Sequence, residues 1–106
     1  MNALEEFIRH TEKCASDVLC AKLAHQTSYG GEIRRYTLPK NYTNAEAAEF
    51  FRSINFNYYA GYGRQELYGT IWYTDGTWSE RVSYDGSEWW EHKQQPDFDK
   101  EVECNE

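Results

Sequence analysis

The chain has 106 residues, a net charge of −7 and an aromatic content of 17%. This length suits a single domain with one modest core, and the negative charge disfavours direct binding to nucleic acid. The N-terminus is charged rather than signal-like, and no run approaches the roughly 18 apolar residues of a membrane span. We therefore expect a cytoplasmic protein with no cofactor and no membrane contact. Its cysteines are expected to be free thiols, with a Cys14–Cys20 bridge as the alternative.

The first half of the chain predicts a helix followed by a hairpin. An asparagine N-cap and an apolar stripe indicate a helix over residues 3–14. Alternating residues over 17–25 and a second run over 33–38, ended by Pro39, indicate two strands joined by a turn at 28–31.

A second helix and a less regular segment follow. Thr43 and Glu46 form a capping box, and the apolar residues after them predict a helix to about residue 54. Residues 55–63 are rich in tyrosine, asparagine and glycine and are interpreted as a short strand followed by a loop.

Two Asp-Gly pairs, Asp75-Gly76 and Asp85-Gly86, are the strongest local signal in the chain. Asp-Gly favours tight primed turns, so the pairs predict a three-stranded meander over 66–74, 77–84 and 87–93. With these turns, one sheet face is apolar. The other face is rich in threonine, serine and arginine and carries Tyr68, Trp72, Ser79 and Arg81.

These elements predict an α+β fold with the order α-β-β-α-β-β-β. An antiparallel sheet of about five strands has two helices packed on its apolar face. The domain covers residues 1–96, and an acidic tail covers 97–106. The tail carries a net charge of −4, which leaves −3 for the other 96 residues.

Motifs for catalysis and metal binding are sparse. The pair His10 and Cys14 is four residues apart on a predicted helix, but no further ligand has metal-site spacing. A hydrolase would have to use a carboxylate pair and a histidine on the sheet, such as Glu66, Glu88 and His92. No nucleophile elbow, phosphate loop or dinucleotide fingerprint is present.

The aromatic residues on the predicted exposed face favour a protein interface, because tryptophan, tyrosine and arginine are the commonest interface anchors. Ring pairs that only stabilise the sheet are the plainer interpretation. Adjacent tryptophans at 89 and 90 must point to opposite faces of a regular strand. The acidic tail would add attraction to a basic partner. The expected partner-binding residues are Tyr68, Trp72, Arg81, Trp90, Asp97, Asp99, Glu101 and Glu103.

The segments Gly61–Arg81 and Tyr84–Glu91, with the strings GTIWYTDGTW and YDGSEWW, resemble small uncharacterised proteins encoded by bacteriophages. The resemblance covers the C-terminal third to half of the chain and brings no known active site. It implies a phage or mobile-element origin. By analogy of class, such proteins often bind host proteins, including restriction and CRISPR machinery.

The leading hypothesis is therefore a non-enzymatic, phage-type binding protein that inhibits or redirects a host protein by occupying a basic surface. The first alternative is a protein that binds or sequesters a nucleotide or small molecule, using the same rings with Arg64 or Arg81. The second alternative is the small hydrolase. Homodimerisation through the aromatic face is compatible with all three hypotheses.

Overall fold

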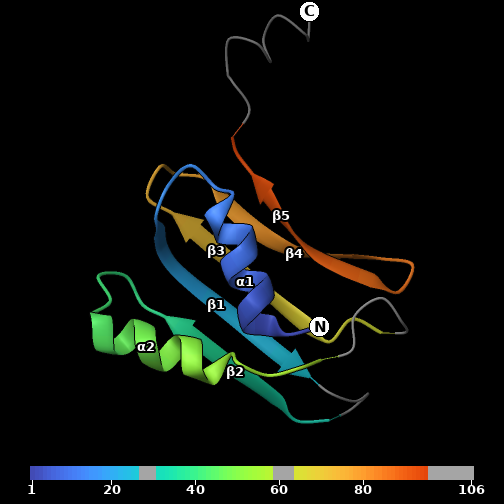
Figure 1. Ribbon diagram of the computed structural model, residues 1–106. Helices are drawn as coiled ribbons and strands as arrows, with labels where there is room; N and C mark the ends of the chain where they lie inside the picture. The colour runs from blue at the N-terminus through green and yellow to red at the C-terminus, as the bar shows by residue number, and fades with distance from the viewer. Residues whose placement is uncertain (27–30, 59–63, 96–106) are drawn as a thin grey trace, which may run out of the picture.

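The computed structural model describes residues 1–26, 31–58 and 64–95. It confirms the predicted α+β class and element order (Figure 1). The elements are α1 (Ala3–Glu12), β1 (Val18–Gln26), β2 (Ile33–Leu38), α2 (Asn44–Ser53), β3 (Leu67–Tyr73), β4 (Trp78–Tyr84) and β5 (Ser87–Lys93).

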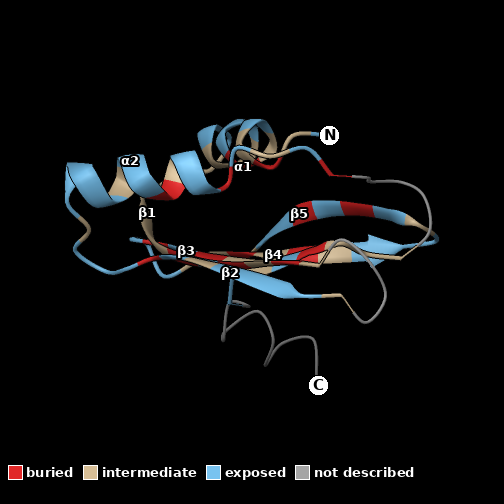
Figure 2. Ribbon diagram, turned by 90° about the horizontal axis from the view of Figure 1, so that it is seen from below, coloured by how far each residue is buried: buried red, intermediate tan, exposed pale blue. Residues whose placement is uncertain are grey.

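The strands form one antiparallel sheet in the order β2-β1-β3-β4-β5. The first hairpin lies beside the meander because β1 pairs with both β2 and β3. Figure 2 shows α1 and α2 together on one side of the sheet, whereas no described helix covers the other side. The described part of the chain is thus two-layered, and its helices leave one sheet face open.

Both helices begin as their sequences indicate. The side chain of Asn2 accepts a hydrogen bond of 2.9 Å from the backbone of Glu5, and the Thr43–Glu46 capping box is complete. The helix α1 ends two residues earlier than predicted, at Glu12. In place of the predicted strand at 55–58, Asn57 makes an isolated bridge to Asn2. The rest of that prediction, at 59–63, and most of the 28–31 turn lie outside the described residues.

The two Asp-Gly turns differ in length. At the second turn, Asp85 and Gly86 both have positive φ, and Tyr84 pairs with Ser87, as in the predicted two-residue primed turn. At the first turn only Gly76 has positive φ, and the N–H of Tyr73 donates to the carbonyl of Thr77. Three residues, not two, therefore separate the strands at this turn, and the prediction of a tight primed turn is wrong there.

This extra loop residue reverses the predicted face of β4. With a two-residue turn Trp72 would lie opposite Ser79, but the observed partner of Trp72 is Trp78. A one-residue change of register moves every side chain of a strand to the other face. Ser79 and Arg81 consequently point toward the helices, where they are buried. Trp78, Glu80 and Val82 join Trp72 on the open side.

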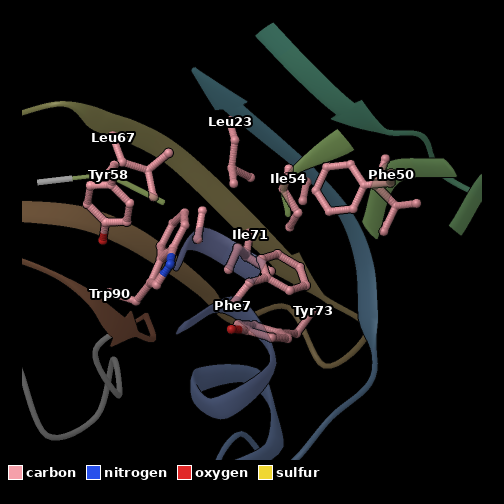
Figure 3. Packing of buried hydrophobic residues seen from close by; sticks show 12 residues of the cluster. Phe7, Leu23, Phe50, Ile54, Tyr58, Leu67, Ile71, Tyr73 and Trp90 are labelled. Carbon is pink, nitrogen blue, oxygen red and sulfur yellow. The ribbon is translucent and has the colours of Figure 1, made fainter. Parts of the chain in front are cut away.

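The core lies between the helices and the sheet and is built largely from rings. Phe7 of α1 packs edge-on against Phe50 of α2, with ring centroids 5.5 Å apart, and edge-on against Trp90 of β5 at 6.5 Å. Figure 3 shows these side chains gathered with Ile71 and Tyr73 of β3. Phe7 therefore links α1 to α2 and to β5.

Candidate interaction surface

The uncovered side of the sheet, hereafter the open face, is a regular grid of side chains. Its rows follow from the strand pairing; one row reads Cys20, Trp72, Trp78 and Lys93 across β1, β3, β4 and β5. By strand alternation, the open face comprises Cys20, Lys22, Ala24, Gln26, Ile33, Arg35, Thr37, Tyr68, Thr70, Trp72, Trp78, Glu80, Val82, Tyr84, Ser87, Trp89, Glu91 and Lys93.

Large apolar side chains are concentrated on this face. Ile33, Tyr68, Trp72, Tyr84 and Trp89 are all exposed, with exposed fractions from 36% for Trp72 to 76% for Tyr84. Among the described residues, the exposed large hydrophobic side chains outside this face are at positions 1 and 8. Contiguous exposed apolar surface on a small protein typically marks a binding surface.

The two halves of the open face differ in charge and shape. Over β1 and β2, one hollow of about 200 Å³ is lined by Lys22, Arg35 and Tyr68 together with Leu23, Ala24, Thr37 and Gly69. A second hollow, of about 300 Å³, is lined by Lys22, Lys40 and Trp72 with Cys20. No carboxylate lines either hollow.

The other half, over β4 and β5, carries most of the rings and the carboxylates of the face. Glu80 lies directly opposite Glu91, and Trp89 opposite Val82. Glu80 accepts a hydrogen bond of 2.9 Å from the indole N–H of Trp78 and an ion pair of 3.3 Å from Lys93. The Trp78 hydrogen bond, and after it Lys93, lowers the pKa of Glu80, so this carboxylate is charged at neutral pH.

The structure places the predicted interface residues in two different environments. Tyr68 and Trp72 lie on the open face, as expected. The prediction that Arg81 and Trp90 are exposed anchors is wrong, because both point into the core, with exposed fractions of 9% and 6%. The register of β4 explains why Arg81 points into the core. Trp90 is buried with it because it lies directly opposite Arg81 on β5. The expected tail residues Asp97, Asp99, Glu101 and Glu103 lie outside the described residues.

Arg81 is the centre of a buried ion-pair network. Its guanidinium donates to Glu6 of α1 at 2.7 Å and to Glu88 of β5 at 3.0 Å, and it also donates to the hydroxyl of Tyr58. The same guanidinium lies 5.3 Å from the ring centroid of Trp90. Burial, the largest single influence, lowers the pKa of Arg81, but the contacts with Glu6, Tyr58 and Glu88 together outweigh it and raise the pKa. Arg81 is therefore a structural cation rather than a ligand-binding group.

The groups that a hydrolase would need are engaged elsewhere. The carboxylate of Glu88 accepts from two backbone N–H groups as well as from Arg81, and its side chain is 1% exposed. Glu66 pairs with His25 at 3.2 Å. His92 is exposed and bonds to the hydroxyl of Thr77. This geometry does not favour the hydrolase hypothesis.

A second polar cluster lies beneath the C-terminal end of α1. The ring of His10 and the hydroxyl of Tyr73 each lie 2.7 Å from the hydroxyl of Ser79, which is fully buried. Burial, and then the charges of His92 and Lys13, lower the pKa of His10. The imidazole of His10 is therefore neutral at neutral pH and forms one end of the chain of hydrogen bonds through Ser79 to Tyr73. Because Ser79 is fully buried, a substrate could not reach its hydroxyl.

The cysteine and metal predictions are tested in the described part of the chain. The thiol of Cys14 lies 4.0 Å from the imidazole of His10, and no third metal-ligating side chain joins them among the described residues. Cys14 and Cys20 are both free, so the alternative bridge between them is not formed. Cys104 lies outside the described residues.

A further hollow, of about 430 Å³, lies on the helix side of the sheet. His25, Arg34, Tyr36 and Phe56 contribute to its lining, with Glu32, Ser53 and Asn57. The ring of His25 stacks on Phe56 with centroids 4.4 Å apart. Sequence reasoning missed this hollow, because its residues come from separate segments that share no motif.

Sequence reasoning also missed most of the open face, including Lys22, Arg35, Trp78, Tyr84 and Trp89. The alternation of β1 could have indicated Lys22. The sheet face on which Trp78 and Tyr84 lie depends on the length of the turn before β4, which an Asp-Gly pair does not determine.

No protein-family model matches the chain, and comparison with curated proteins and with solved structures gives no match. Within the described residues, neither helix has the length and apolar character needed to cross a membrane.

Proposed function

We propose that this chain is a non-enzymatic binding protein and that the open face is its protein interface. The observation that supports this most is the concentration of exposed rings on a sheet face that no described helix covers. Aromatic side chains are strong interface anchors because they bury a large area while losing few rotatable bonds. If the rings served only to stabilise the sheet, they would not need to lie beside hollows on the face that the described helices leave open.

The charge distribution assigns different roles to the open face and to the rest of the surface. The open face carries three cationic and two acidic side chains, hence +1, and because the whole chain carries −7, the remainder carries −8. This acidic remainder would attract a basic partner and accelerate its association. In the phage context that the sequence resemblance implies, the partner is a host protein with a basic surface, which the bound protein inhibits or redirects.

The proposal is tested by affinity capture from bacterial lysate with a matched set of variants. Trp72→Ala with Trp89→Ala removes two rings of the open face, whereas Glu49→Ala with Arg52→Ala removes an exposed ion pair on α2. We expect the helix variant to retain the captured partner and the ring variant to lose it. High salt should weaken capture by the unchanged protein, because screening removes the attraction of the acidic remainder.

The thermal stability of the ring variant is the control for folding. Unchanged capture by a well-folded ring variant would contradict the open face as the interface. Capture that does not respond to salt would contradict the electrostatic part of the proposal.

A second candidate function, binding of a small anionic molecule, is favoured by the hollow beside His25. Arg34 supplies a cation there, and Tyr36 and Phe56 supply rings. Arg81, one of the arginines considered from the sequence, is buried, and Arg64 bonds to Gln26. A nucleotide should then raise the melting temperature of the unchanged protein but not that of Arg34→Ala. No shift with either protein would contradict this candidate.

A further inference from the structure

We infer that the partner which the open face fits is a second copy of this chain. In this assembly two open faces pack against each other around a two-fold axis parallel to the strands. The inference rests on the proposed function, since it concerns the same surface, and it assigns that surface to a second copy in place of a host protein. Symmetric dimers are the commonest protein assemblies, and they require a surface that is complementary to itself. The open face meets that requirement in charge and in shape.

Charge complementarity follows from the position of each strand. A two-fold axis parallel to the strands and centred on β3 places β1 over the partner's β4, and β2 over the partner's β5. Lys22 lies in the same row as Thr70, Glu80 and Glu91. The rotation places each row of one copy over the same row of the other copy, with the order of the strands reversed. Lys22 of one copy therefore faces Glu80 of the other, and this pair forms twice.

Shape complementarity follows from the size of the side chains. The hollows lie over β1 and β2, where Cys20 and Ala24 are small. The rotation brings Trp78 of the second copy over Cys20. If the β3–β4 register is continued to Tyr68, it also brings Trp89 over Arg35, a pairing of ring and guanidinium. Rings of one copy would thus fill hollows of the other, as side chains interdigitate between packed sheets.

The central strand completes the contact. Tyr68 and Trp72 of β3 lie on the axis and would meet their own counterparts. The sheets of such sandwiches cross at about 30°, so the pairings hold best for β1, β3 and β4 near the axis.

The other way to stack two open faces is disfavoured. An axis in the plane of the sheet but perpendicular to the strands would place β1 over β1 and β4 over β4. The hollows of one copy would then face the hollows of the other. The strand that carries Lys22 would face the partner's Lys22 strand, and the strand that carries Glu80 would face the partner's Glu80 strand. Like charges facing each other oppose association.

The test is a charge exchange followed by sedimentation equilibrium and light scattering over a range of concentrations. We expect a dimer for the unchanged full chain. Lys22→Glu alone and Glu80→Lys alone should each raise the dissociation constant by about tenfold or more, and the double variant should recover most of the affinity. Arg52→Glu and Glu49→Lys are matched controls, because they make the same changes in net charge on the exposed surface of α2.

The outcomes separate the inference from the proposed function. A monomer at all concentrations, or a dimer indifferent to reversal at Lys22, overturns the inference; an indifferent dimer would use another surface, such as a sheet edge. If the chain is monomeric but ring variants lose a captured host protein, the interface stands and only its partner is wrong. If the chain is monomeric and ring variants capture normally, both fail.

Discussion

Arg81 and Glu88 lie seven residues apart in the chain on paired strands, with their charged atoms 3.0 Å apart and both side chains only 1% exposed. The remaining hydrogen-bonding capacity of both charged groups is also satisfied. Glu88 accepts from the backbone of Glu66 and Leu67, and Arg81 reaches Glu6 on α1. The network thereby connects α1 to β4, β5 and the start of β3 at one end of the core.

Arg81→Met should destabilise the protein by about 3–5 kcal/mol, because it leaves the carboxylates of Glu6 and Glu88 buried without their cation. The measurement is chemical unfolding at neutral pH. The exposed pair of Arg52 and Glu49 is the control, since both of its side chains are 70% exposed. Arg52→Met should change stability by less than about 1 kcal/mol. Equal effects of the two substitutions would contradict the structural role of Arg81.

The sequence predicted the helices and strands well, but it assigned the side chains of β4 to the wrong faces of the sheet. The error arises from the length of the turn that precedes β4. An Asp-Gly pair fits a two-residue primed turn, as at Asp85, and also the end of a three-residue loop with glycine in the left-handed region, as at Gly76. In the observed loop Asp75 accepts a hydrogen bond of 3.0 Å from the backbone of Thr77. Because an Asp-Gly pair fits a turn of either length, the register of β4 could not be predicted from local sequence and depends on tertiary contacts.

Hydrophobicity did not correct this error. On β4, Trp78 and Val82 alternate with Ser79 and Arg81, so the apolar set suggests the core face. The structure buries the polar set instead, because Glu6 and Glu88 neutralise Arg81, and His10 and Tyr73 bond to Ser79. These partners come from distant segments. The open face could therefore be predicted on β3 but not on β4.

The adjacent residues Trp89 and Trp90 provide a matched comparison of the two sheet faces. Trp90→Ala should cost about 3–5 kcal/mol, because it leaves a cavity beside Phe7 and Arg81. Trp89→Ala, at 38% exposure, should cost less than about 1 kcal/mol in the monomer. Unfolding is measured at low protein concentration, so that association does not contribute. A larger loss at Trp89 would mean that the two faces of β5 are reversed.

The half-buried imidazole of His10 predicts a loss of stability in acid. Burial lowers its pKa in the folded protein below the ordinary histidine value of about 6.5, so the unfolded chain binds the proton more readily. Stability from this residue is complete above about pH 6.5, falls as the pH drops through that value, and levels off below the folded-state pKa. The measurement is the urea midpoint between about pH 7.5 and pH 5, compared with that of His10→Gln, which should lose less stability in acid.

His92 gives an internal check, because its charge is the second cause of the lowered pKa of His10. His92→Gln should therefore reduce the acid-induced loss without abolishing it. Parallel acid profiles for the unchanged protein and His10→Gln would show that other groups dominate the acid response.

Gly69 is the position where β3 has no room for a side chain. A Cβ there would lie 2.5 Å from the carbonyl oxygen of Lys22 and 3.0 Å from the Cα of Leu23, and φ is +153°. Both obstacles are backbone atoms of the paired strand and cannot rotate away. Gly69→Ala should therefore cost at least about 2 kcal/mol. Gly76→Ala is the control, because its φ of +88° brings strain of about 1–2 kcal/mol but nothing lies within 4 Å of its Cβ. If thermal unfolding ranks Gly76→Ala as the more damaging substitution, the close approach of β1 and β3 at Gly69 is wrong.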